Sequence, residues 1–247
     1  MAAVVGFPNG GYRYLAGVFQ YSSGVAAEPG YEIERARFRA PLALAEGFAA
    51  VEAHLRAIGR PTTAFAACEL RSPAPFTERG FTEFNREYVK TLAKWGLYAD
   101  ERNPVARTNV CPAIDVPKEP LLHAFSYTVP RRGAFGGFVI AGSGETEEGH
   151  ASYRERTVRY GESSADAMRD KVRHVVAVMG RRLEALGFSW REATAVNAYT
   201  VRDIGALMGP ELAARGASPL TWHYARPPVE GLEFEMDVRG VARELVL

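Results

Sequence analysis

Apolar residues along the chain recur with two different periods, which predicts strands interspersed with helices. Helices are expected at residues 42–58 and 76–95, where apolar side chains recur at steps of three and four. The first helix should end at Gly59, because a glycine followed by a proline is a common helix terminator. The strands expected in this half are residues 12–21, 31–38, 62–70, 106–111 and 121–129.

The same succession of patterns begins again near Arg131. Helices are expected at residues 165–186 and 204–214, the second weakened by Gly205 and Pro210. The strands expected in this half are residues 138–144, 154–160, 193–201, 221–225 and 232–241. This order of elements predicts an α+β protein.

Short sequences at corresponding places support a duplication. Residues 55–59 (LRAIG) line up with residues 183–187 (LEALG), and Ser23-Gly24 lines up with Ser143-Gly144. A repeat of this size indicates duplication of a whole domain, although two unrelated α+β domains can share the same coarse order. We therefore expect two tandem domains, residues 1–130 and 131–247, each a β-sheet packed on two helices.

Composition excludes several classes of function. The 30 Lys and Arg residues nearly balance the 29 Asp and Glu residues, which argues against a nucleic-acid or anionic-membrane surface. No apolar stretch is long enough to cross a membrane, and no signal-peptide pattern is present, so the cytoplasm is the expected compartment. Cys68 and Cys111 belong to no metal-ligand motif, so no structural zinc is expected.

Three segments of the first half resemble motifs of the RidA (YjgF) superfamily. The helix from Ala43 ends in a glycine, residues 84–88 (FNREY) resemble the family's Met-Asn-x-x-Tyr segment, and residues 104–110 (PVARTNV) resemble its Pro-Ala-Arg-Ser/Thr motif with one inserted residue. The second half lacks the arginine motif, and residues 221–228 stand in its region. It keeps Glu233-Phe234-Glu235, which resembles the family's glutamate strand, whereas the first half has residues 121–126 there.

The resemblance implies a tandem pair of RidA-like, chorismate-mutase-like domains. This tandem arrangement is similar to that of two groups of enzymes, the chorismatases and the 2-amino-5-chloromuconate deaminases. The second group is closer to this chain in length. Members of the superfamily form trimers with pockets between subunits. Because the arginine survives in one half and the glutamates in the other, the pocket is expected between the two domains.

Arg107 is the first candidate for binding substrate. The resemblance implies that it binds the carboxylate of a small acid, and its planar guanidinium suits that role because it forms two parallel hydrogen bonds. A charged residue among Val105, Ala106 and Val110 needs an anionic partner. That partner is either a substrate carboxylate or an acidic side chain in a structural ion pair.

Four residues are candidates for acid–base catalysis. Glu233 and Glu235 alternate along a strand, so they point to opposite faces, and a solvated strand edge is the alternative for both. His123 and His223 are either catalytic imidazoles or buried structural histidines. Hydrolytic deamination consists of proton transfers and attack by water, so we expect neither a metal nor a cofactor.

Further residues are candidates for binding the substrate. A dicarboxylate needs a second cation, for which Arg226 is favoured over Arg202 and Arg71. Asn109 and Cys111 share the strand face of Arg107. Ser23, Gly24 and Ser143 lie at strand ends where backbone N–H groups can bind a carboxylate, although turn formation explains them equally well. The aromatic residues Phe81, Phe84 and Tyr88 are assigned to the core.

The favoured function is a deaminase that acts on a 2-aminomuconate-like enamine or imine dicarboxylate and releases ammonia and an oxo-acid. One alternative is a chorismatase-like hydrolase. The other is a non-catalytic protein that binds small keto or imino acids.

Overall fold

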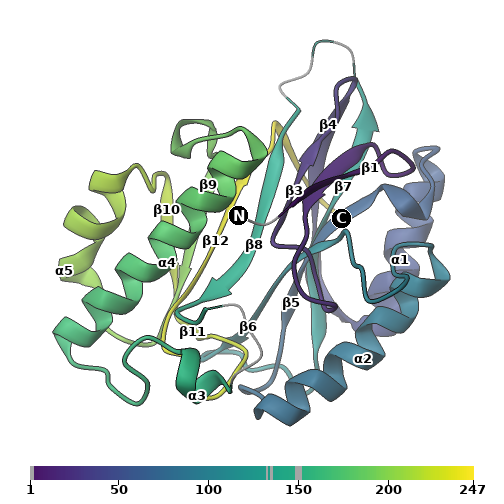
Figure 1. Ribbon diagram of the computed structural model, residues 1–247. Helices are drawn as coiled ribbons and strands as arrows, with labels where there is room; N and C mark the ends of the chain where they lie inside the picture. The colour runs from purple at the N-terminus through teal and green to yellow at the C-terminus, as the bar shows by residue number, and fades with distance from the viewer. Residues whose placement is uncertain (1–2, 132, 134–135, 148–151) are drawn as a thin grey trace.

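Two β-sheets face each other in the centre of the molecule, and helices cover their outer faces (Figure 1). The computed structural model describes residues 3–131, 133, 136–147 and 152–247. The seven-stranded sheet has the order β1 (Val4–Phe7), β2 (Tyr12–Leu15), β3 (Gly24–Ala27), β8 (Phe138–Gly144), β12 (Glu235–Gly240), β9 (Ala195–Tyr199) and β10 (Leu220–His223). The six-stranded sheet has the order β11 (Ala225–Arg226), β6 (Ala106–Pro112), β5 (Phe65–Arg71), β7 (Leu121–Pro130), β4 (Tyr31–Ala43) and β13 (Arg243–Val246).

Each sheet has its own helical cover, which confirms the predicted α+β class. The six-stranded sheet packs on α1 (Leu44–Ala57) and α2 (Glu78–Lys94). The seven-stranded sheet packs on α4 (Ala165–Leu186) and on a second helical segment. That segment comprises α5 (Gly205–Leu207), η3 (Met208–Leu212) and η4 (Ala213–Arg215), and the remaining short helices are η1 (Thr62–Ala64), α3 (Tyr153–Arg156) and η2 (Trp190–Glu192).

The two halves of the chain exchange strands. The β1–β3 segment of the first half joins the seven-stranded sheet, where Val25 pairs with Val139 of β8. In return, β13 at the C-terminus lies parallel to β4 in the six-stranded sheet, and β11 pairs with β6. A division between residues 130 and 131 therefore separates the helices but not the strands.

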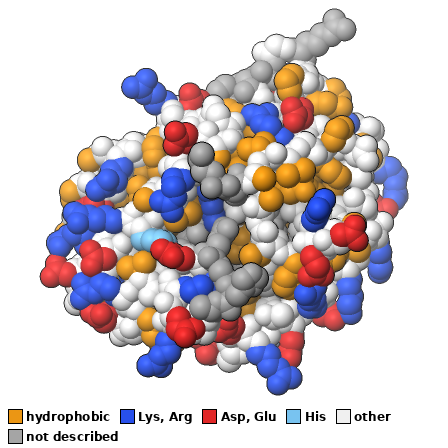
Figure 2. Space-filling view, in the orientation of Figure 1, with side chains coloured by type: hydrophobic (Ala, Val, Ile, Leu, Met, Phe, Trp, Pro, Cys, Tyr) orange, Lys and Arg blue, Asp and Glu red, His pale blue; other side chains and the backbone are white. Residues whose placement is uncertain are grey.

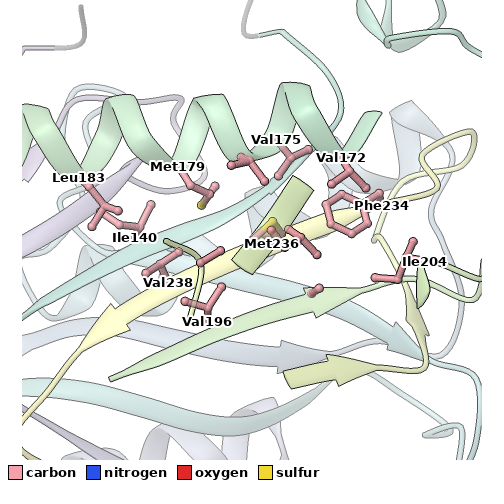
Figure 3. Packing of buried hydrophobic residues seen from close by; sticks show 14 of the residues in the cluster. Ile140, Val172, Val175, Met179, Leu183, Val196, Ile204, Phe234, Met236 and Val238 are labelled. Carbon is pink, nitrogen blue, oxygen red and sulfur yellow. The ribbon is translucent and has the colours of Figure 1, made fainter. Parts of the chain in front are cut away.

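Helix α4 packs on its sheet through one apolar face (Figure 3). Val175, Met179 and Leu183 point from the helix toward Ile140 and Val238 on the strands. The helix begins after Ser164, whose hydroxyl accepts a hydrogen bond from the backbone of Ala167. It ends at Gly187, whose φ of 85° favours glycine. These local signals explain why its predicted bounds agree with the structure.

Small side chains let the two sheets approach each other closely. Ala66, Ala67 and Ala106 of the six-stranded sheet share a buried cluster with Ala141 of the seven-stranded sheet. The strands β6 and β8 thereby face each other, one from each half of the chain. The site described below lies along these two strands.

Several predicted elements differ from the structure. The strand expected at 154–160 is wrong, because residues Tyr153–Arg156 form α3. Ser152 and Glu155 cap its first turn reciprocally, and Arg159 beyond it has a φ of 47°, which breaks extended structure. The helix expected at 204–214 is divided into three short segments by its glycines and Pro210. Strands β1 and β13 were not predicted, because they are largely exposed edges without an apolar repeat.

Charged side chains of both signs are interspersed over the face in Figure 2, with apolar side chains between them. This distribution agrees with the near-zero net charge of the sequence. Within the described residues, no helix is both long enough and apolar enough to cross a membrane.

Candidate functional site

A cavity of about 190 Å³ lies between the two halves of the chain. Strand β6 contributes Arg107 and Asn109, strand β8 contributes Gly142, Ser143 and Gly144, and strand β12 contributes Glu235. Helix α2 contributes Glu78 and Phe81, α3 contributes Tyr153 and Arg156, and α4 contributes Arg182. Tyr21, from the segment before β3, also lines the cavity. Pockets for drug-sized ligands measure roughly 300–1,000 Å³, so this cavity suits a smaller molecule.

Arg107 brings a buried positive charge to the cavity wall. Arg107 is 3% exposed, and within the described part of the chain neither its Nη1 nor its Nη2 has a hydrogen-bond partner. Four aromatic rings surround the guanidinium carbon at 4.6–5.8 Å from their centres, those of Tyr21, Phe81, Phe84 and Tyr88. Ring faces attract a cation but accept no strong hydrogen bond. Within the described residues the guanidinium therefore has no hydrogen-bonded anion, and the cavity gives it access to one.

Asn109 adds a second donor on the same face of β6. Its Oδ1 accepts a hydrogen bond of 2.9 Å from the hydroxyl of Ser72, which fixes the orientation of the amide. Its Nδ2 has no partner in the described residues. Arg107 and Asn109 are two positions apart on a strand and so point the same way. Together they form a cluster of unused N–H donors that matches a carboxylate.

Glu235 is a buried acidic side chain in the cavity lining. It is 3% exposed, and burial raises the pKa of its carboxyl well above the ordinary value, helped by the neighbouring carboxylates of Asp237 and Glu145. Arg107 and Arg182 act in the opposite direction, but burial dominates. The raised pKa favours the protonated form of Glu235, which is the form that a proton donor needs.

A fully buried ion pair holds the backbone just before Glu235. Nζ of Lys171 lies 3.0 Å from Oε1 of Glu145, and both side chains are 0% exposed. The same carboxylate accepts hydrogen bonds from the backbone N–H groups of Glu233 (2.6 Å) and Phe234 (3.0 Å). Helix α4 is thereby linked to the start of β12. The position of Glu235 depends on this link.

Two of the acid–base candidates lie in the polar interior between the sheets, outside the cavity lining. Nε2 of His223 is 3.0 Å from Oδ1 of Asn197, and its ring stacks on Tyr199. Burial and the charge of Arg71 lower the pKa of His123 to about 3, so it is neutral. Their surroundings agree with the alternative of buried structural histidines.

The remaining acid–base candidate is also outside the cavity lining. Glu233 forms a two-bond ion pair with Arg202, with N–O distances of 2.8 and 2.9 Å. The two glutamates therefore have different surroundings. Glu233, just before β12, is paired near the surface, whereas Glu235, the first residue of β12, is buried in the cavity wall.

The substrate-binding candidates are divided in the same way. Ser143 lines the cavity. Arg226 is exposed on β11 and lies outside the lining, as does its pairing partner Cys111 on β6. Burial raises the pKa of the Cys111 thiol to about 12, so it stays protonated and is a poor nucleophile. Gly24 is buried in β3.

A second cavity of about 300 Å³ adjoins the first on the side of α4. Ser23 lies in its wall, together with Leu15, His174, Val178 and Arg181. The two cavities share Ser143, Thr146, Glu147 and Arg182. Ser143, Thr146 and Glu147 lie at or just beyond the C-terminal end of β8, and Arg182 lies on α4.

Sequence reasoning missed Arg182 and Tyr153 in the first cavity. Arg182 follows Arg181 in a regular helix, and the sequence does not distinguish the two. Tyr153 lies on α3, whose Ser152-x-x-Glu155 capping pattern was the available signal. Phe81, Phe84 and Tyr88 are assigned to the core from the sequence; they are buried or half-buried, and their rings also surround the guanidinium of Arg107.

Among the described residues, no group of three or more His, Cys, Asp or Glu side chains is placed to hold a metal ion. The functional groups of the cavity include the donors of Arg107 and Asn109 that have no partner in the described structure, the buried carboxyl of Glu235, the guanidinium groups of Arg182 and Arg156, and the exposed carboxylates of Glu78 and Glu147. These groups can bind an anion and transfer a proton.

Comparison with known proteins gives relatives over the full chain. The chain is 57% identical over 251 residues to 2-amino-5-chloromuconate deaminase of Comamonas testosteroni, covering 100% of both proteins. Among solved structures, the YjgF gene product of E. coli is 15% identical and covers 53% of this chain and 93% of its own, with a TM-score of 0.31. A putative endoribonuclease of Thermotoga maritima is 17% identical and covers 42% of this chain and 78% of its own, with a TM-score of 0.32. The model of the family described as 2-aminomuconate deaminase CnbZ matches residues 4–245, and the chain belongs to that family.

Proposed function

We propose that this protein hydrolyses a 2-aminomuconate-type enamine dicarboxylate to ammonia and the corresponding 2-oxo acid, and that the cavity between β6 and β12 is its active site. One observation carries the proposal. The guanidinium of Arg107 is buried and lacks a hydrogen-bond partner within the described structure, yet it lines a cavity that also contains the carboxyl group of Glu235, whose pKa burial raises well above its ordinary value. Family membership and the name of the 57% identical relative support the choice of substrate.

The first role of the cavity is to bind the carboxylate next to the amino-bearing carbon. Arg107 and Asn109 donate to this carboxylate from one strand face, and the aromatic rings exclude water from the ion pair. Charge-assisted bonds of this kind are stronger in such a setting than in water.

The second role is proton transfer by Glu235. Its carboxyl gives a proton to a carbon of the conjugated chain, which converts the enamine into an imine. Water then attacks the imine carbon and loses a proton to the Glu235 carboxylate. Glu235 gives this proton to the nitrogen, the carbon–nitrogen bond breaks and ammonia leaves, and the hydroxyl group of the intermediate returns a proton to Glu235 as the carbonyl group forms. One water is consumed and one ammonia is released, so the catalyst returns to its starting state.

Assembly, compartment and the domain boundary are part of the same proposal. The resemblance to RidA-like proteins implies a homotrimer, and the sequence pattern favours the cytoplasm and a boundary near residues 130 and 131. Light scattering on the purified protein decides the number of subunits, and a mass other than three chains removes the trimer from the proposal.

The function is tested by incubating the purified protein with 2-aminomuconate and measuring ammonia and the oxo-acid. We expect release far above the spontaneous rate, and loss of most of it in R107Q while the circular dichroism spectrum stays native. Pyruvate release from chorismate would instead support a chorismatase. Stabilisation by a 2-oxo acid without any turnover would support a binding protein, and either result contradicts the proposal.

A further inference from the structure

Arg182 reaches the cavity from the opposite side to Arg107. It projects from α4, and its Nη1 donates a 3.2 Å hydrogen bond to the carbonyl of Ala141 on β8. The next residue along β8, Gly142, lies against the carboxyl of Glu235. Arg182 is therefore held at the strand segment that supports the acid, whereas Arg107 approaches from β6 of the other sheet.

The two guanidinium groups act on the same carboxyl. The positive charges of Arg107 and Arg182 both lower the pKa of the Glu235 carboxyl, and all three residues line the same cavity. Arg156 also lines the cavity, where it lies 4.8 Å from the ring centre of Tyr153 and donates to the carbonyl of Glu147. Arg107 and Arg182 are the cations of the cavity with the largest effect on the pKa of Glu235.

A dicarboxylate has one negative charge at each end and its reacting carbons between them. The arrangement of the cavity matches this pattern, with a cation on each wall and Glu235 near both. Arg226, which the sequence suggested as the second cation, is exposed on β11 and lies outside the lining. The second cavity beyond Arg182 leaves room for the far end of an extended molecule.

We propose that Arg182 binds the carboxylate at the far end of the substrate from Arg107, so that the two arginines together select a dicarboxylate over a monocarboxylate. This inference rests on the proposed function for the identity of the substrate. Arg182 is the residue that determines selectivity for a dicarboxylate, and this role can be tested without turnover.

The test compares the binding of two stable ligands by calorimetry. Muconate carries a carboxylate at each end, and sorbate has the same six-carbon diene with a methyl group in place of one carboxylate. We expect the native protein to bind muconate roughly tenfold to a hundredfold more tightly, as loss of a charged hydrogen bond predicts. The R182Q variant should lose this preference while its affinity for sorbate stays unchanged.

Two further variants serve as controls. R107Q should weaken the binding of both ligands, because each has a carboxylate that Arg107 can bind. R169Q replaces an exposed arginine of the same helix that pairs with Asp166 and should retain the native preference. Because the preference is a ratio measured within one variant, a change in stability does not affect its interpretation as long as the variant is folded.

The outcomes separate the two proposals. If R182Q keeps the native preference for muconate, or if the native protein has none, the role of Arg182 is overturned whether or not the protein releases ammonia. If R182Q loses the preference but the native protein does not deaminate 2-aminomuconate, the dicarboxylate site stands and the proposed function fails.

Discussion

The carboxyl group of Glu235 occupies the space that a side chain at Gly142 would need. A methyl group at that position would overlap Oε1 of the glutamate. Only a residue without a side chain lets β8 support the acid at this place. The sequence suggested this segment for its backbone donors, but the contact shows that the glycine also makes room for the proposed acid.

The G142A variant should therefore lose activity by displacing Glu235. Position 142 carries no positive φ, so the alanine is acceptable to the backbone and the effect comes from the displaced carboxyl. We expect kcat to fall more than tenfold with a smaller change in KM. The matched control is G180A on α4, where a methyl group meets only the edge of Trp190 at 3.7 Å. Native kcat in G142A would contradict the placement of the acid.

Replacing Arg107 should change activity and stability in different directions. R107M removes a buried charge that lacks a hydrogen-bond partner within the described structure and puts an apolar chain among the aromatic rings. We expect kcat/KM to fall by roughly 100-fold or more, because two charged hydrogen bonds to substrate are lost. The free energy of unfolding should stay equal or rise, since the cost of burying the charge disappears. Urea unfolding measures it, and marked destabilisation would indicate a structural ion pair instead.

The stability of the protein should depend on pH through Glu235. In the unfolded chain this carboxyl has an ordinary pKa of about 4.3, whereas burial raises its pKa in the folded protein. The folded state holds a proton that the unfolded state releases, so the free energy of unfolding falls as pH rises above the unfolded pKa. The E235Q variant cannot ionise and avoids this loss. Its stability relative to the native protein should increase with pH, and parallel pH curves would contradict the raised pKa.

Breaking the buried ion pair between Lys171 and Glu145 should be costly. In K171M the carboxylate of Glu145 loses its cation but stays out of water, which costs about 3–5 kcal/mol. Activity should also fall, because Glu145 holds the backbone that leads into Glu235. The control is K90M, which breaks a surface pair with Glu87 and should cost less than about 1 kcal/mol. Equal denaturation midpoints for the two variants would contradict the structural role of the buried pair.

The sequence predicted the long helices well because their signals are local. The apolar face of α4, its Ser164 cap and its terminal Gly187 all lie within the segment itself. The exchange of β1–β3 and β13 between the sheets was not predicted, because strand pairing depends on distant partners and leaves no mark in the apolar pattern. The alternating residues at 154–160 predict a strand, whereas the capping pattern of Ser152 and Glu155 indicates the helix α3 that the structure contains.

The candidate site could be predicted only in part. Arg107 and Glu235 were found through motifs that resemble a known family, and the structure brings both into one cavity. His223 and Glu233 were equally reasonable from sequence, but their partners, Asn197 and Arg202, come from other strands and loops. Burial and partners of this kind depend on tertiary structure, which a single sequence does not reveal.

A crystal structure with muconate bound tests the central claim most directly. We predict that one carboxylate of the diacid accepts hydrogen bonds from the guanidinium of Arg107 and the amide of Asn109, with the diene beside the carboxyl of Glu235. If muconate binds elsewhere, for example near His223 and Arg71 between the sheets, and leaves Arg107 without an anion, the cavity is not the active site and the account is contradicted.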